Sequence, residues 1–269
     1  MLVKVGCEFG YSATFPVAAV TQVEPRPDGP HRVISATWGT SPDVDVRTYT
    51  DLFGNPCRRF TIAPGAFRMR YDALTEVADW ADETHLDLAE VPPDRLPDEC
   101  LVFTLPSRYC PSDELADTAW QLFGALTPGW RRVQSIADFV NGHLAFRYGA
   151  STPLTTGADA YRNGEGVCRD FAHLFVTFCR ALTIPTRYVF GYLPDIDVEP
   201  TDAPMDFAAW TEVYLGGRWW TFDPRNNRPR TGRVLIGRGR DALDVAMVTT
   251  YGAPVLDDMV VWAERVLDE

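Results

Sequence analysis

The sequence predicts an α+β fold, in which an N-terminal antiparallel β-sandwich is followed by a core domain of helices packed on an antiparallel sheet. Strand-like alternation of apolar residues fills roughly the first seventy positions, whereas helical periodicity and then a hairpin pattern follow position 111. Residues 79–111, rich in Pro, Asp and Glu, lie between the two and indicate a connector. We therefore expect a β-sandwich domain over residues 1–110 and a core domain over residues 111–269.

The β-sandwich is predicted from several short strands separated by turns. Asp51–Asn55 reads Asp-Leu-Phe-Gly-Asn, which is typical of a turn between two strands. Many short strands at this spacing favour a sandwich. The alternating runs are Val3 to Cys7, Val44 to Tyr49, Arg58 to Ile62 and Phe67 to Tyr71.

Two helices are predicted at the start of the core domain. Ser112, followed by two acidic residues, is a suitable N-cap for a helix that ends near Phe123. A second helix is expected to begin near Arg131, because apolar residues recur at helical spacing from there to Leu144. We expect both helices to pack against a central helix.

That central helix carries Cys168 in its first turn. The stretch from Gly164 to Tyr192 places the cysteine after a glycine-rich turn and before an apolar helix and a short strand. Unpaired N–H groups and the positive end of the helix dipole favour a thiolate there, so a lowered thiol pKa is expected. The alternative is a buried structural cysteine at a helix start.

A hairpin is predicted next. Trp210 to Leu215 and Arg218 to Phe222 read as strands joined by Gly216-Gly217. A two-residue turn makes Leu215 face Arg218, which places positions 208 and 223 diagonally on one face of the sheet. A base at 208 could then be oriented by the carboxylate of Asp223, but position 208 is an alanine.

Four segments, in order, resemble the transglutaminase-like superfamily, cysteine enzymes related in architecture to papain-like proteases. The resemblance implies a Cys-His-Asp triad, with Cys168 as nucleophile and Asp223 as acid, while Ala208 stands at the family's histidine position. It also implies the bacterial type with an N-terminal β domain, and a site lined by Arg169, Asp170, His173 and Trp210. The segments are Gly166–His173, Ile184–Tyr192, Ala209–Leu215 and Trp220–Asn227, and Tyr49–Asn55 and Leu105–Asp113 resemble the N-terminal domain.

The missing base has few candidate replacements among the four histidines. His173 lies about 140° around the helix from Cys168 and should point away from it. His143, near the end of the preceding helix, could approach the site, whereas His31 and His85 are expected at the surface or in loops. A metal site of Cys168, Asp170 and His173 is disfavoured, because this spacing does not converge on one tetrahedral ion. No metal or cofactor is expected.

Composition and charge limit the partners and the compartment that we expect. The net charge of −12 and pI near 4.8 argue against nucleic acid or an anionic membrane as partner. The chain lacks a signal peptide or an apolar stretch of membrane-spanning length, and its six cysteines are widely spaced, so we expect a cytoplasmic protein with free thiols.

Two functions remain open. In the first, Cys168 attacks an amide or thioester, and water or an amine resolves the acyl-enzyme, making the protein a hydrolase or acyltransferase. In the second, a pseudoenzyme binds a peptide or protein partner in the cleft. Four arginines within residues 225–233 either form a solvated loop or attract an acidic substrate or an acyl-carrier domain.

Overall fold

The computed structural model describes residues 1–199 and 203–267, and its N-terminal part contains two four-stranded antiparallel sheets. Both sheets bury apolar side chains in one shared core, which includes the alternating residues Val3, Val5 and Cys7. The predicted β-sandwich is therefore confirmed. The first sheet has the order β14 (Val255–Arg265), β1 (Leu2–Ala13), β6 (Gly65–Val77), β3 (His31–Ser41); the second has the order β13 (Val248–Tyr251), β2 (Val17–Thr21), β5 (Pro56–Ile62), β4 (Arg47–Thr50).

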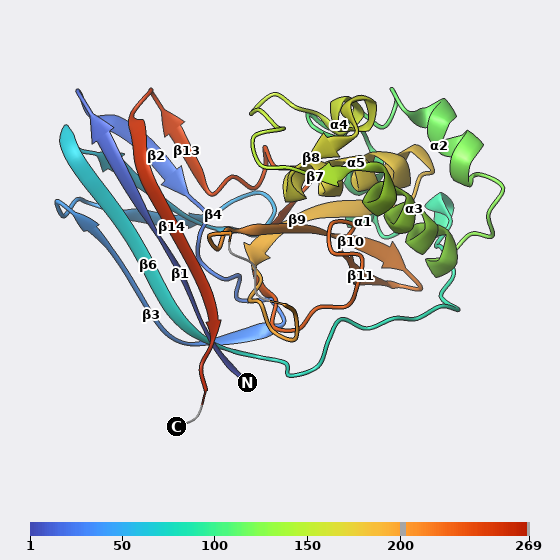
Figure 1. Ribbon diagram of the computed structural model, residues 1–269, viewed down its shortest axis with the longest axis horizontal. Coiled ribbons are helices and arrows are strands. Elements are labelled where there is room, and N and C mark those ends of the chain that lie inside the picture. The colour runs from blue at the N-terminus through green and yellow to red at the C-terminus, as the bar shows by residue number, and fades with distance from the viewer. Residues whose placement is uncertain (200–202, 268–269) are drawn as a thin grey trace.

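The C-terminal strands complete this sandwich. β14 pairs along β1 from Val3↔Arg265 to Ser12↔Val255, and β13 pairs with β2. Residues 248–265 had been predicted as part of the core domain, but they add an edge strand to each N-terminal sheet (Figure 1). The division at residue 110 thus describes the order along the chain, and the sandwich also needs the C-terminal strands.

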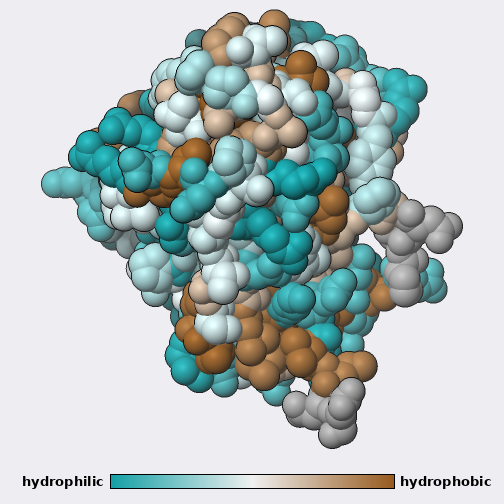
Figure 2. Space-filling view, turned by 90° about the vertical axis from the view of Figure 1, so that its left-hand side faces the viewer, coloured by the Kyte–Doolittle hydropathy of each residue, from teal (hydrophilic) through white to brown (hydrophobic). Residues whose placement is uncertain are grey.

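The outer face of the first sheet is polar. Arg68 pairs with Glu8 and Asp258, and Arg70 pairs with Glu8 and Asp72. Figure 2 views the molecule from this side and shows a mainly hydrophilic surface, with hydrophobic atoms gathered toward its lower end. The charged rows follow from period-two alternation, which sends every second side chain outward.

The core domain has a four-stranded antiparallel sheet covered on one face by helices (Figure 1). Among the described residues, no helix is long and apolar enough to cross a membrane. The sheet has the order β11 (Arg218–Phe222), β10 (Ala208–Leu215), β9 (Thr186–Tyr192), β12 (Val234–Gly239); the helices are α2 (Ala116–Phe123), α3 (Trp130–His143), α4 (Gly157–Asn163) and α5 (Cys168–Ala181), with a short α1 (Asp98–Leu101), 3₁₀ turns at Pro93–Arg95 and Val102–Thr104, and a β7 (Ala145–Phe146)–β8 (Glu165–Gly166) pair.

Helix α5 is the buried centre of this domain. Every residue from Asp170 to Arg180 is buried, and the apolar ones pack against α3, against α2 and against the sheet. Phe171, Phe175 and Cys179 of the predicted stripe lie in the core of this domain, whereas Cys168 packs against the core that extends into the sandwich. Because the helix is enclosed on all sides, the position of its first residue is set by packing.

One predicted helix boundary was wrong. Ser112 is buried and does not cap a helix; α2 begins at Ala116, and its N-cap position, Leu115, has no side-chain cap. Residues 112–115 form turns, with the Glu114 amide donating to the Pro111 carbonyl. The predicted helix near Arg131 is present as α3.

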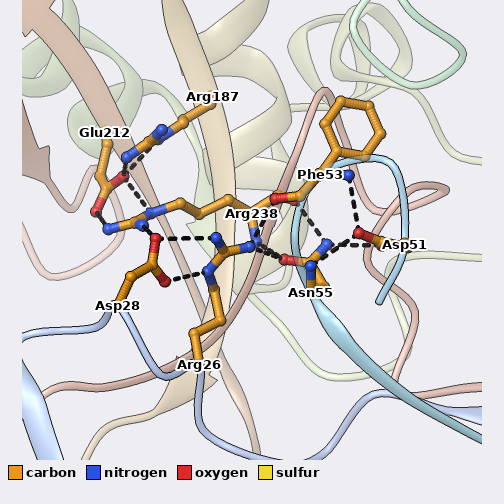
Figure 3. Close-up of polar contacts among 8 residues, drawn as sticks. All are labelled: Arg26, Asp28, Asp51, Phe53, Asn55, Arg187, Glu212 and Arg238. Atoms are coloured by element: carbon orange, nitrogen blue, oxygen red, sulfur yellow. Dashed lines mark hydrogen bonds and ion pairs between the residues drawn. The ribbon is translucent and has the colours of Figure 1, made fainter. Parts of the chain in front are cut away.

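A polar cluster fastens the sandwich to the core sheet (Figure 3). Asn55 is fully buried; its side-chain nitrogen donates to the Arg238 carbonyl, and its oxygen accepts from the Arg238 amide. Arg238 in turn donates to Glu212 of β10, which Arg187 of β9 also contacts. The turn predicted at 51–55 is therefore an interdomain contact.

Candidate active site

Cys168 is the first residue of α5 and is partly exposed. Its Sγ lies 4.0 Å from the carbonyl oxygen of Phe207, just before β10. Two residues earlier, only glycine fits at position 166, because a Cβ there would lie 2.6 Å from the Cβ of Asp170. The glycine thus allows the chain to pass close to the helix start, as the sequence predicted.

Asp170 and Arg169 build the helix start. The Asp170 carboxylate is buried and accepts hydrogen bonds from the Val167 amide at 2.8 Å and from the Ser151 hydroxyl at 3.0 Å. Arg169 donates to Ser151 and to the Thr152 carbonyl. Asp170 therefore satisfies the N–H group of Val167, the N-cap residue of α5, and holds the preceding loop through Ser151.

The thiol pKa is raised, which corrects the expectation of a lowered one. Burial is the largest cause, and the Asp206 carboxylate acts in the same direction. The Ala209 and Arg169 amides and the Arg225 guanidinium lower the pKa without outweighing burial. The expectation from the helix dipole was wrong because desolvation destabilises the thiolate more than the N-terminal end of the helix stabilises it.

The predicted hairpin register is confirmed from Leu215↔Arg218 to Thr211↔Phe222. Ala208 begins β10 and Asp223 follows the end of β11, both beyond the last paired residues of the hairpin, so the diagonal placement of 208 and 223 stays a prediction. The Asp223 carboxylate already has hydrogen-bond partners of its own. Its carboxylate accepts from the Asn226 amide at 3.0 Å and from the Asn226 side chain at 2.7 Å.

Arg233 is the second residue whose side chain binds the Asp223 carboxylate. Its Nη2 donates to Asp223 at 2.9 Å, its Nε donates to Asp82, and its guanidinium lies over the Trp210 ring, 4.9 Å from the centroid. Trp210 is buried and leaves room for no side chain at Gly191, where a Cβ would lie 2.5 Å from the ring. Trp210 therefore supports the buried ion pair rather than lining either cavity at the thiol.

No histidine lies in the cavities beside Cys168, and all four histidines belong to the described chain. His173 is fully buried; its Nε2 accepts from the Ala242 amide at 3.1 Å, and its ring stacks on Tyr109. His143 lies against Tyr161, with its Nε2 2.7 Å from the Tyr161 carbonyl oxygen. His173 points away from the thiol, as predicted, and His143 does not approach it.

The other two histidines also lie elsewhere. His85 is exposed, contacts Glu83 and packs against Trp220, in agreement with a loop position. His31 begins β3, where burial lowers its pKa to about 4. The metal hypothesis has no support from this arrangement, since His173 and Asp170 are each engaged with backbone groups and do not converge with Cys168.

Cys168 opens onto two cavities. The first, which we call the apolar cavity, has a volume of about 520 Å³ and lies toward the segment that leads from β12 to β13. The second, the arginine cavity, has a volume of about 540 Å³ and lies toward residues 193–199 and 225–230. Both have the size of typical small-molecule sites. Their shared wall consists of Val167, Cys168, Asp206, Phe207, Ala208 and Ala209.

The two cavities differ in chemistry. The apolar cavity is lined by side chains such as Tyr188, Phe190, Leu243, Val245 and Met247. Arg225, Arg228 and Arg230 line the arginine cavity, together with Phe146, Tyr148, Asp195 and Glu199. A molecule bound across Cys168 would therefore have an apolar group on one side and a polar group on the other.

The arginine segment 225–233 is not a uniformly solvated loop. Arg230 and Arg233 have side chains only 4% and 6% exposed. Arg230 donates to the Pro194 carbonyl, and Arg225 lies over the Phe146 ring, 4.4 Å from its centroid. Only Arg228 is largely exposed, so the cavity keeps positive charge in fixed positions.

Asp206 is the residue at this site that sequence reasoning missed. It lies two positions before Ala208, in both cavities, and among the described residues it is the only carboxylate in their shared wall. Its Oδ1 accepts from the Phe207 amide at 2.7 Å. The signal available in the sequence was an isolated aspartate just upstream of the altered histidine position.

The chain is similar in sequence and in fold to known proteins. Residues 117–224 match the family model described as the transglutaminase-like superfamily. The chain superposes with a TM-score of 0.90 on a candidate cysteine protease from Cytophaga hutchinsonii, with 28% identity over 100% of this chain and 92% of that one.

Two curated mycobacterial relatives, both uncharacterized, match part of the sequence. The protein from Mycobacterium leprae is 37% identical over 137 residues, which cover 48% of this chain and 49% of its own. The protein from Mycobacterium tuberculosis strain H37Rv is 31% identical over 122 residues, covering 42% and 39%. The matched part thus spans half or less of these relatives.

Proposed function

Because residues 117–224 form a domain of the transglutaminase-like superfamily, we propose that this protein is a thiol enzyme in which Cys168 accepts an acyl group. The thiol attacks the carbonyl carbon of a thioester or an amide, and water or an amine then releases the acyl group. The reaction is hydrolysis or acyl transfer, depending on which acceptor reaches the acyl-enzyme.

One observation carries this proposal: the thiol stands at the start of α5 in the wall shared by two cavities. An acyl group and a leaving group can lie on opposite sides of the sulfur. The Ala209 and Arg169 amides lie close enough to the sulfur to lower its pKa, and N–H groups so placed can stabilise an oxyanion.

The missing histidine favours a thioester over an amide as substrate. An amide needs its departing nitrogen protonated, which Ala208 cannot do, whereas a thiolate leaves without that help. We propose that the acyl group occupies the apolar cavity. The arginine cavity suits a negatively charged leaving group, on a peptide, a protein or an acyl-carrier type partner.

We also place the protein in the cytoplasm. All six cysteines are free, and Cys7, Cys57, Cys100, Cys110 and Cys179 are buried as packing residues. Unpaired thiols in this number are typical of a reducing compartment.

The test is acylation of Cys168 by a simple thioester. Incubation with phenyl thioacetate, followed by intact mass and peptide mapping, should give an acetyl group on Cys168 and then free acetate. Cys168→Ala should form neither product while keeping the fold, since it removes one sulfur at a helix end. Acetate release by Cys168→Ala equal to that of the wild type would overturn the proposal.

The second candidate, a pseudoenzyme that binds its partner without turnover, is favoured by the burial-raised thiol pKa together with Ala208. It predicts no acyl-enzyme and a thiol that iodoacetamide alkylates slowly near neutral pH. Because a raised thiol pKa is expected of both candidates, alkylation is read together with acylation. Acetyl-Cys168 formed from phenyl thioacetate supports the enzyme, and slow alkylation without any acetyl-enzyme supports the binding protein.

A further inference from the structure

The wall between the two cavities contains one group able to accept a proton from Cys168. Of its six residues, Val167, Phe207, Ala208 and Ala209 have apolar side chains, which leaves Asp206 beside the thiol. Asp206 lies two residues before Ala208, the position of the missing histidine. Both therefore lie at or just before the start of β10.

The backbone holds the Asp206 carboxylate in the wall that it shares with the thiol. Its Oδ1 accepts a hydrogen bond from the Phe207 amide at 2.7 Å. The carbonyl of Phe207 is the group 4.0 Å from Sγ, so one residue contacts the thiol and anchors the carboxylate. The structure records no hydrogen bond from a described residue to the other oxygen of Asp206, Oδ2.

Electrostatics couples the two groups. The negative charge of Asp206 raises the pKa of the Cys168 thiol, because two like charges disfavour each other. Loss of solvent around the Asp206 carboxyl raises its own pKa, which makes it a stronger base than an exposed aspartate. A carboxylate of raised basicity in the same cavity wall as a thiol is a candidate for proton transfer.

We propose that Asp206 accepts the Cys168 proton and serves as the general base of the site in place of a histidine at position 208. The inference rests on the proposed acyl transfer and adds a catalytic residue to it. A carboxylate is a weaker base than imidazole, so this replacement suits substrates with good leaving groups, such as thioesters.

The reaction balances with this one acid–base group. Asp206 Oδ2 takes the proton of Sγ while the sulfur lone pair forms the S–C bond and the C=O π pair moves to oxygen. When the C=O bond re-forms, the bond to the leaving thiol breaks, and the leaving thiolate takes the proton from Asp206. Water then adds in the same way: it gives its proton to Asp206 and forms the new C–O bond, and Sγ leaves and recovers the proton.

Several charged groups surround the pair and set its pH behaviour. Arg169 faces it from α5, Arg225, Arg228 and Arg230 from the loop after β11, and Asp195 and Glu199 from the segment after β9, with Tyr109 and Tyr188 completing the apolar side. Burial raises the Asp206 pKa, and the hydrogen bond from the Phe207 amide opposes that rise. Acylation should fall as the pH falls through the Asp206 pKa.

The test compares wild type with Asp206→Asn, Asp206→Glu and the control Asp87→Asn, an exposed aspartate outside both cavities. Two rates are measured on each protein: alkylation of Cys168 by iodoacetamide, and acylation of Cys168 by phenyl thioacetate. Asp206→Asn should lower acylation about 100-fold or more, the usual weight of a general base. The same change should speed alkylation, because removal of the neighbouring charge lowers the thiol pKa.

Opposite movement of the two rates is the expected signature. Asp206→Glu should restore much of the acylation, and Asp87→Asn should match the wild type in both rates. Acylation by Asp206→Asn within about twofold of the wild type overturns the role of Asp206 and leaves the proposed function standing. A wild-type protein that alkylates but never forms the acetyl-enzyme overturns the proposed function itself.

Discussion

Arg233 donates a hydrogen bond from Nη2 to Oδ2 of Asp223 at 2.9 Å, and both side chains are almost fully buried, 6% and 3% exposed. The resemblance to the transglutaminase-like superfamily assigns Asp223 to the position of an acid that orients a histidine. In this chain a guanidinium takes the place of that partner, and the same guanidinium pairs with Asp82 from the connector. The acid has become part of the structure that ties connector, hairpin and loop together.

Asp223→Ala should therefore lower stability rather than only activity. The change leaves Arg233 buried with Asp82 as its one carboxylate and removes the acceptor of the Asn226 turn. Removing one partner of a buried pair typically costs about 3–5 kcal/mol. Urea unfolding measures it, with Asp258→Ala as the control, since the exposed Arg68–Asp258 pair should contribute about 0–1 kcal/mol. Equal costs for the two variants would contradict this assignment.

Ala208→His should restore part of the family's chemistry. An imidazole at 208 would lie in both cavities beside Cys168 and would lower the thiol pKa by stabilising the thiolate. The gain should be incomplete, because Asp223 is committed to Arg233 and cannot orient the ring. The pH profile of iodoacetamide alkylation checks this, and Ala208→Gln controls for side-chain size. A profile identical to that of the wild type would show that position 208 does not reach the thiol.

The sequence was most informative where local patterns decide structure. Helical periodicity predicted α5 with Cys168 in its first turn, and the Gly216-Gly217 turn predicted the hairpin register that relates 208 to 223. It was least informative where contacts between distant segments determine the structure. The pairing of β14 with β1 and the burial of Arg233 between Asp82 and Asp223 join residues far apart in the chain, and no local pattern encodes them.

The thiol environment illustrates the same limit. A helix N-terminus is visible in a sequence, but the burial that raises the Cys168 pKa depends on tertiary packing, including the contact with Phe207, 39 residues away. Asp206 was overlooked because its meaning depends on the two cavities that it shares with the thiol.

Asn55→Ala should loosen the contact between the sandwich and the core sheet. Asn55 makes hydrogen bonds with Arg26, Asp51 and Arg238, and its side chain is fully buried. Its removal leaves the Arg238 amide and carbonyl without these partners, at a cost of about 1–3 kcal/mol for each unsatisfied group. Thermal unfolding should show a lower Tm, while Asn163→Ala, at the exposed end of α4, should change it little. An unchanged Tm for Asn55→Ala would show that the cluster does not stabilise the chain.

His173 should make the protein sensitive to acid. Its pKa in the folded protein lies well below 6.5, because the ring is buried beside Arg169 and Arg180. Below about pH 6.5 the unfolded chain binds a proton here that the folded chain does not, so stability falls as the pH falls. Uptake of one proton by the unfolded chain alone limits the loss from this group to about 1.4 kcal/mol per pH unit.

His173→Gln tests the origin of that loss. The glutamine oxygen can still accept from the Ala242 amide but cannot take up the proton, so the fall in unfolding free energy between pH 7.5 and pH 5 should shrink. Carboxylates and His31, whose pKa is lowered to about 4, contribute to the slope in both proteins and cancel in the comparison. The exposed His85, changed to Gln, should leave the slope as it is. If the slopes of His173→Gln and wild type coincide, the acid sensitivity arises elsewhere.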